Sequence, residues 1–246
     1  MTPGGCGYLS GPAERQVTAG PPVGVAPPPP KAVRDIFGDR LATVERYVAL
    51  LAGPGAERGL IGPREIDRVW ERHVLNCAVV AELVPSPCTL VDIGSGAGLP
   101  GIVLAILLPD VSVILVDSML KRSVFLAECA AELGLVNVEV HRGRAEDLAG
   151  VLSADVVTAR AVAPLHQLVE WAAPLVRPGG TILAIKGARA ADELAEARGL
   201  LRRLGVRRAE ILTVGQDKVE PGTVVIRMAA GDGKRAPLRA RRPGPA

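Results

Sequence analysis

Apolar residues in the centre of the chain alternate between short continuous runs and longer stretches with helical spacing. The short runs at 89–93, 112–117, 137–141, 155–158 and 181–185 are typical of buried parallel strands. The stretches predict helices at 99–108, 119–133, 164–176 and 190–204, with a short acidic helix before residue 155. Two closing strands, 209–214 and 222–229, are joined by a short loop and should be antiparallel. The pattern predicts a mainly parallel seven-stranded α/β sheet with an antiparallel final strand and helices on both faces.

The chain before the sheet shows helical periodicity only. Apolar positions predict helices over 33–52 and 64–84, and Gly53-Pro54-Gly55 is expected to end the first. Residues 1–31 are rich in Gly and Pro without periodicity, which indicates a disordered leader. We therefore predict four parts: the leader 1–31, a helical extension 32–86, an α/β domain 87–229 and a tail 230–246.

Charge separates the tail from the rest of the chain. The net charge is +3, yet residues 231–246 alone contribute Lys234, Arg235, Arg239, Arg241 and Arg242 against Asp232. A disordered basic tail favours a polyanion partner, whereas a tail of biased composition without any partner would show the same residues. The four cysteines lack zinc or disulfide spacing, and the chain has neither a signal peptide nor a membrane-spanning run. We expect a cytoplasmic protein with reduced thiols, no metal and no membrane partner.

A glycine-rich turn follows the first predicted strand. Gly94, Gly96 and Gly98 let the backbone turn sharply and approach a ligand, and the next helix would offer free N–H groups to an anion. Pro100 suits the first turn of that helix, and Asp92 ends the strand. A glycine-rich connection without a ligand would show the same residues, so the turn alone leaves both interpretations open.

Candidate ligand-binding side chains follow the other strands, because ligands bind beyond the carboxyl ends of such sheets. Asp117 could accept bonds from both ribose hydroxyls or cap the next helix. Glu146, after Ala145, could reach an adenine amino group or merely begin a helix. Trp70 and Trp171 are expected in the core, and His73 is either a satisfied helix residue or part of a substrate mouth. Further cations at this edge are Lys121, Arg122, Arg160 and Lys186.

Several of these segments together resemble one family. Asp92-Ile93-Gly94-Ser95-Gly96-Ala97-Gly98-Leu99-Pro100-Gly101 is similar to the cofactor loop of the ribosomal small-subunit methyltransferase G family (class I, dependent on S-adenosylmethionine, SAM). Val116-Asp117-Ser118, Arg72-His73, Ala159-Arg160-Ala161 and Lys186-Gly187 extend the resemblance over roughly residues 33–228. It implies a Rossmann-like methyltransferase that modifies N7 of one guanine in 16S rRNA.

The resemblance also implies which residues form the site. By the resemblance, cofactor contacts would be Gly94, Leu99, Ala145, Glu146 and Arg160, and the glycine turn and the strand ends add Asp92, Gly96, Gly98 and Asp117. The candidate contacts to RNA phosphates at this edge are Arg72, His73, Lys121, Arg122 and Lys186, although Lys121 and Arg122 would also suit a solvated helix face. The partner would be 16S rRNA within the small ribosomal subunit or its precursor, and we expect the enzyme to act as a monomer.

The segments after the fourth and fifth strands bear on the chemistry. Thr158–Pro164 lacks the Asn/Asp-Pro-Pro-aromatic motif of amino-group methylation, and no cysteine follows either strand as a nucleophile for pyrimidine carbon 5. Guanine N7 needs neither, because its lone pair attacks the methyl group directly. We therefore expect Arg160 to position the reactants, with no general base.

Other function classes remain open from the sequence. A SAM methyltransferase acting on a small molecule or a protein would carry the same loop, and so would a non-catalytic RNA- or nucleotide-binding module. A dehydrogenase fits poorly, because the third glycine is tightly spaced and the sheet ends in antiparallel strands.

Overall fold

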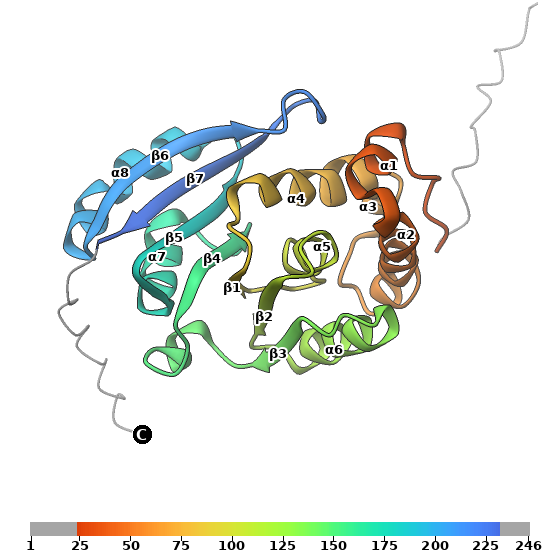
Figure 1. Cartoon of the computed structure of the whole chain (residues 1–246), viewed down its shortest axis with the longest axis horizontal. Coiled ribbons are helices and arrows are strands. Elements are labelled where there is room, and N and C mark those ends of the chain that lie inside the picture. Colours follow the sequence, from red (N-terminus) through yellow and green to blue (C-terminus); the bar gives the residue numbers. More distant parts are fainter. Residues whose placement is uncertain (1–23, 232–246) are drawn as a thin grey trace, which may run out of the picture.

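The computed structural model describes residues 24–231, whose centre is a seven-stranded sheet (Figure 1). Its order is β3-β2-β1-β4-β5-β7-β6. The strands are β1 (Cys88–Ile93), β2 (Val111–Asp117), β3 (Val138–Arg142), β4 (Ala154–Arg160), β5 (Val176–Lys186), β6 (Val206–Val214) and β7 (Thr223–Ala230). Pairing from β3 to β5 is parallel, whereas β7 is antiparallel to both β5 and β6. The predicted sheet is confirmed.

Helices cover both faces of the sheet, as predicted. One face carries α5 (Gly101–Leu107), α6 (Leu120–Leu133) and the N-terminal helices, and the other carries α7 (Leu165–Ala172) and α8 (Ala190–Arg203). Short 3₁₀ turns lie at Ala145–Leu148 and Ala173–Leu175. Side chains of β1 alternate between the two cores: Leu90 joins the first and Val91 the second.

The N-terminal segment is a series of short helices. They are α1 (Lys31–Phe37), a 3₁₀ turn (Gly38–Arg40), α2 (Leu41–Leu50), a wide π-helical turn (Leu51–Gly55), α3 (Pro63–Ile66), a second wide turn (Val69–Leu75), α4 (Asn76–Ala78) and a 3₁₀ turn (Val79–Leu83). The prediction of two long helices is wrong in this respect. Gly38, at φ 47°, interrupts the first, and Gly53-Pro54-Gly55 does not end it. The wide turn accommodates Pro54, which lacks the N–H of a regular turn.

Three predicted boundaries also move. Residues 24–30 of the predicted leader lie against the fold, where Trp70 Nε1 donates to the Pro27 carbonyl at 2.6 Å. Pro100 is the N-cap of α5 rather than part of its first turn. β5 begins at Val176 and includes Arg177-Pro178-Gly179-Gly180, with a register shift against β4. The predictions for residues 1–23 and 232–246 lie outside the described residues. Between residues 24 and 231, no helix is long and apolar enough to cross a membrane.

Candidate functional site

A cavity of about 380 Å³ lies at the carboxyl ends of the parallel strands. The loops after β1, β2, β3 and β4 reach it, together with α7. It brings together the predicted residues Gly94, Asp117, Arg122, Ala145 and Glu146. It is also lined by Ile93, Val116, Ser118, Gly143, Arg144, Val162, Gln167 and Trp171. The cavity is where the sheet topology places a ligand site.

The glycine loop after β1 is held by its own backbone. The N–H groups of Gly94 and Ser95 both donate to the Val116 carbonyl of β2, at 2.8 and 3.1 Å. Gly98 has φ 99°, and a Cβ there would lie 2.5 Å from Ile102 Cγ1 and 2.9 Å from the Tyr47 hydroxyl. Only glycine fits this position, so the third glycine is required by packing as well as by conformation.

The side chain of Asp117, the last residue of β2, accepts hydrogen bonds from both the loop after β1 and the loop after β2. Its Oδ2 accepts from the Gly96 N–H at 3.0 Å, and its Oδ1 accepts from the Met119 N–H at 2.9 Å. The second bond closes a turn just before α6, whose N-cap is Met119 rather than Asp117. The side chain is 2% exposed and lies 3.5 Å from Arg122 Nη1. Asp117 therefore fixes the cavity wall and also lines the cavity.

Asp92 lies beneath the loop rather than on the cavity wall. It is fully buried, and its Oδ2 accepts from the Gly101 N–H at 3.1 Å. Its Oδ1 has no hydrogen-bond partner among the described residues. Burial raises the pKa of the carboxyl to about 7. In this structure Asp92 joins the end of β1 to the first residue of α5.

The N-terminal helices take part in the site through Tyr47. This α2 side chain is fully buried, and its hydroxyl donates to the Ala97 carbonyl in the glycine loop at 2.8 Å. Sequence reasoning missed it. The one available signal was a tyrosine within an otherwise apolar helical stripe, since a buried hydroxyl needs a hydrogen-bond partner.

Arg160 connects the end of β4 to the wide turn Val69–Leu75. Its guanidinium donates to His73 Nδ1 at 2.6 Å and to the Arg72 carbonyl at 3.1 Å, and lies 3.2 Å from Cys77 Sγ. His73 Nε2 lies 2.8 Å from Glu65 Oε2. Burial, with Arg160 as a second cause, lowers the pKa of His73. The neutral ring therefore accepts from Arg160 and donates to Glu65.

The loop after β4 is strained and passes directly over the glycine loop. Ala161 has φ 52°, which non-glycine residues rarely adopt. A Cβ on Gly94 would lie 2.8 Å from Val162 Cγ2, so the two loops touch. Such strain at a cavity is typical of functional positions.

Lys186 holds the same loop from its other side. Its Nζ donates to the Ala163 carbonyl at 2.7 Å and pairs with Glu193 Oε2 at 2.8 Å. That oxygen also accepts from the Leu165 N–H at the start of α7. Only 7% of the Lys186 side chain is exposed. Burial and pairing give Lys186 a role in holding this loop, which argues against the predicted contact of its side chain with RNA.

The remaining predicted residues lie outside the cavity lining. Leu99 packs against the first core, and Lys121 is exposed on α6. Arg72 is half-exposed and pairs with Glu65 at 3.1 Å. Trp70 is buried as predicted, but Trp171 is only partly buried and lines the cavity with Gln167, which corrects its assignment to the core. Trp171 and Gln167 face the cavity because of how α7 packs on the sheet, and no local sequence motif predicts that packing.

Comparison with known proteins gives one consistent family. Residues 40–220 match the family model described as rRNA small subunit methyltransferase G. A protein named ribosomal RNA small subunit methyltransferase G from Thermobifida fusca is 53% identical, over 88% of this chain and 94% of its own. The proteins of that name from Streptomyces coelicolor and Mycolicibacterium gilvum are 51% and 49% identical, covering 84% and 88% of this chain and 87% and 96% of theirs.

Solved structures with low identity share the fold. NSun6 from Pyrococcus horikoshii is similar over 67% of this chain and 53% of its own, with a TM-score of 0.53 and 15% identity. A SAM-dependent O-methyltransferase from Thermotoga maritima is similar over 66% of this chain and 67% of its own, with a TM-score of 0.51 and 14% identity. These likenesses confirm the predicted class I methyltransferase fold.

Proposed function

Because the chain belongs to the rRNA small subunit methyltransferase G family, we propose that it transfers a methyl group from SAM to N7 of one guanine in 16S rRNA. The observation that carries the proposal is the cavity at the carboxyl edge of the sheet. It joins the glycine loop to Asp117 and to Ala145 and Glu146. The proposed setting is the cytoplasm, with a monomer acting on the small ribosomal subunit or its precursor.

The residues around the cavity fit SAM. The volume of about 380 Å³ lies within the usual range for small-molecule sites. Asp117 would accept from the ribose hydroxyls, and the Ala145-Glu146 segment would meet the adenine. The backbone at Gly94 would lie along the cofactor, and Gly96, Gly98 and Leu99 would shape that backbone. Asp92 would act from below by holding Gly101.

The methyl transfer requires the side chains mainly to position the two reactants. When bound, SAM supplies an electrophilic methyl group on a sulfonium. Guanine N7 has an in-plane lone pair and no proton to lose, so no side chain has to act as a base. Arg160, protonated at every working pH, would order the loop after β4. Catalysis would then depend on in-line positioning, with Arg72, Lys121 and Arg122 available to the RNA and His73 acting through its bond to Arg160.

A transfer assay with a position readout tests the proposal. The full chain is incubated with methyl-labelled SAM and either protein-free 16S rRNA or small subunits that lack the modification, and the RNA is digested to nucleosides. We expect label in 7-methylguanosine. Label on an exocyclic amine or a ribose would refute the N7 assignment, and label only in protein would refute the RNA substrate.

A matched pair of variants tests the adenine contact. Glu146 lines the cavity, whereas its exposed neighbour Asp147 does not. Glu146→Ala should weaken SAM binding about tenfold, the effect of one hydrogen bond of about 1.4 kcal/mol. Asp147→Ala should leave SAM binding unchanged. Equal affinities for the two variants in calorimetry would remove Glu146 from the site.

A further inference from the structure

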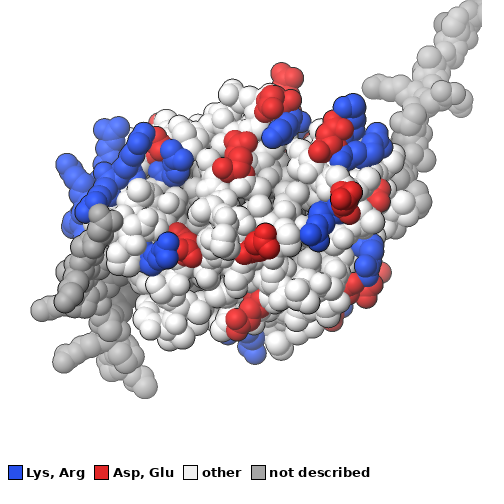
Figure 2. All heavy atoms as spheres, in the orientation of Figure 1, with Lys and Arg blue, Asp and Glu red and all other residues white. Residues whose placement is uncertain are grey.

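Arginines gather on the surface where α8 meets β6. Figure 2 shows positively charged side chains collected over this end of the molecule, at the upper left of the view. The arginine cluster comprises Arg198, Arg202, Arg203, Arg207 and Arg208, all of them exposed. The first three lie on the last turns of α8, and the other two lie at the start of β6.

Three arginines of the cluster, Arg198, Arg202 and Arg203, have no carboxylate partner in the part of the chain that the structure describes. Arg208 pairs with Glu210 at 2.8 Å, and Glu210 also accepts from Arg227. Within residues 24–231, no carboxylate lies within ion-pair distance of Arg198, Arg202 or Arg203. The acidic residues of α8 lie in its first turns instead. The surface therefore has a local excess of positive charge.

Helix stability explains only part of this arrangement. Cations in the last turn of a helix interact favourably with its carbonyl end. This accounts for Arg202 and Arg203 but not for Arg207 and Arg208, which lie in a strand.

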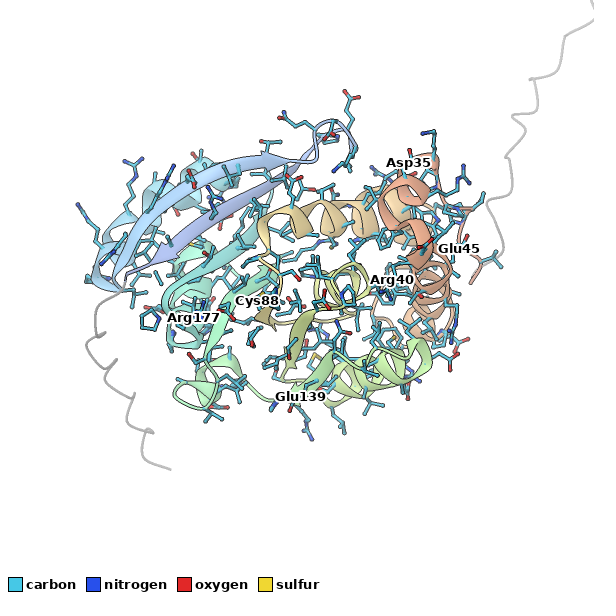
Figure 3. The ribbon with its side chains drawn as sticks, viewed as in Figure 1. Asp35, Arg40, Glu45, Cys88, Glu139 and Arg177 are labelled. Atoms are coloured by element: carbon cyan, nitrogen blue, oxygen red, sulfur yellow. The ribbon has the colours of Figure 1, made fainter. Side chains whose placement is uncertain are left out.

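The cluster lies at the opposite edge of the sheet from the cavity. α8 starts near the carboxyl end of β5 and ends beside the start of β6, where Val206 pairs with Ala230 at the end of β7. Arg177, labelled in Figure 3, begins β5 at the same edge. The seven residues of β4 rise about 3.3 Å each, so roughly 20 Å separate the two edges. A small ligand in the cavity cannot reach the cluster, whereas a large folded RNA can cover both edges.

The basic tail leaves the fold at this cluster. The Gly231 N–H donates to the Gly205 carbonyl, in the turn between α8 and β6, at 2.8 Å. Beyond Gly231 the sequence continues with Lys234, Arg235, Arg239, Arg241 and Arg242. The described chain therefore ends beside the arginine cluster, and the sequence that follows it is basic.

We infer that the arginine cluster is a second RNA-binding surface, which contacts rRNA phosphates remote from the methylated guanine. The inference rests on the proposed rRNA substrate. Phosphate contacts of this kind add affinity and fix orientation without reading the base sequence.

Salt dependence of binding gives the test. We compare the wild-type chain with Arg198→Gln/Arg202→Gln/Arg203→Gln, using protein-free 16S rRNA at several KCl concentrations. Each lost phosphate contact flattens the plot of log affinity against log salt by about 0.7 to 0.9. We expect a slope lower by about 2 to 3 and affinity at least tenfold weaker near 0.1 M KCl, with SAM affinity unchanged. Truncation after Gly231 should flatten the slope further in combination with these substitutions.

Two control variants separate charge at this surface from charge in general. Lys31→Gln/Arg40→Gln/Lys218→Gln removes the same charge from exposed positions elsewhere and should keep a slope close to that of the wild type. Replacing Arg198, Arg202 and Arg203 by Lys should also keep it, because phosphate neutralisation requires only the charge.

Three outcomes would overturn the inference. These are equal slopes for the cluster and control variants, loss of affinity in the lysine variant, and an effect seen with assembled subunits but not with protein-free RNA, which would indicate a ribosomal protein as the partner. Failure of the proposed function looks different, because the wild-type chain itself would then neither bind nor methylate the RNA.

Discussion

The loops after β1 and β4 meet over the same cavity, yet different interactions hold them. The loop after β1 is fixed by backbone bonds to the adjacent strand and by glycines at positive φ. The loop after β4 is fixed by side chains from elsewhere: His73 and Arg72 hold Arg160, and Lys186 holds the Ala163 carbonyl. Asp117 and Tyr47 add side-chain bonds to the loop after β1, but its shape depends on its own glycines, whereas the loop after β4 depends on each of its distant supports. The two should therefore fail in different ways.

The largest expected effect is on the loop after β1. Gly98→Val would place its Cβ against Ile102 and the Tyr47 hydroxyl at a φ of 99°. We expect SAM binding to be lost in calorimetry and the melting temperature to fall by at least about 10 °C, as for an overpacked core of several kcal/mol.

Gly96→Ala is the matched control for that substitution. The nearest atom to its Cβ would be the Gly94 carbonyl oxygen at 3.7 Å, so only the positive φ is penalised, by about 1–2 kcal/mol. If both variants melt at the same temperature, contact with Tyr47 and Ile102 is not what requires Gly98.

The second effect concerns the loop after β4. Arg160→Ala removes the bonds to His73 and to the Arg72 carbonyl and frees the strained Ala161. We expect turnover to fall at least about 100-fold, the scale of a misplacement near 1 Å, with SAM affinity changed less than about tenfold. Cys77→Ala removes a buried sulfur that lies 3.2 Å from Arg160 but keeps the bonds to His73 and to the Arg72 carbonyl, so turnover should be nearly unchanged. Equal losses in turnover and SAM affinity would instead make Arg160 a simple binding residue.

Substitution of Lys186 has a smaller expected effect, and it distinguishes a role in supporting the loop after β4 from a contact with RNA. Lys186→Met removes the buried pair with Glu193 and should destabilise the protein by about 2 kcal/mol, or about 5 °C in melting temperature. The salt dependence of RNA binding should not change. A flatter salt dependence at an unchanged melting temperature would return Lys186 to the RNA-contacting set.

The smallest expected effect is a pH dependence of protein stability that arises from His73, which holds Arg160. Its pKa is lowered in the folded protein, so the unfolded chain binds the proton more strongly. Stability should fall as pH drops below about 6.5, because protonation turns Nδ1 into a donor facing Arg160. His73→Gln should remove a few degrees of this acid-side loss in thermal melts. An unchanged pH profile in the variant would show that the pKa of His73 is the same in the folded and the unfolded chain.

Asp92 acts in the opposite direction and has to be measured separately. Its pKa is raised to about 7, so the folded chain binds this proton more strongly and loses stability as pH rises from about 4 to 7. Asp92→Asn should reduce the loss of stability as pH rises from about 4 to 7. The separate loss of stability at low pH that His73 causes should remain.

The same contrast explains what could be predicted from the sequence. The sheet and the glycine loop were predictable because their signals lie in consecutive residues, such as the apolar run at 112–117 and Gly94 to Gly98. Asp117 was predictable for the same reason, since it ends a strand that the run defines. The breaks in the N-terminal helices were missed because apolar spacing does not distinguish a regular turn from a wide one around Pro54.

Supports that act across the fold were not predictable. Tyr47 lies 50 residues from its carbonyl partner Ala97, and His73 lies 87 residues from Arg160. No local pattern reports such pairs. Lys186 was assigned to RNA because a cation at a strand end resembles a phosphate contact; only the position of Glu193, on the first turns of α8, shows that the charge is used inside the protein.

The place of β7 in the sheet bears on how the chain folds during synthesis. β7 is the last strand of the described residues to be made, and it lies between β5 and β6. Until residues 223–230 leave the ribosome, β5 keeps an open edge and β6 has no strand to pair with. A chain that stops short of β7 therefore exposes a long, apolar, unpaired edge, which invites aggregation. Completion of the sheet therefore requires residues 223–230, and chains that terminate before them cannot complete this fold.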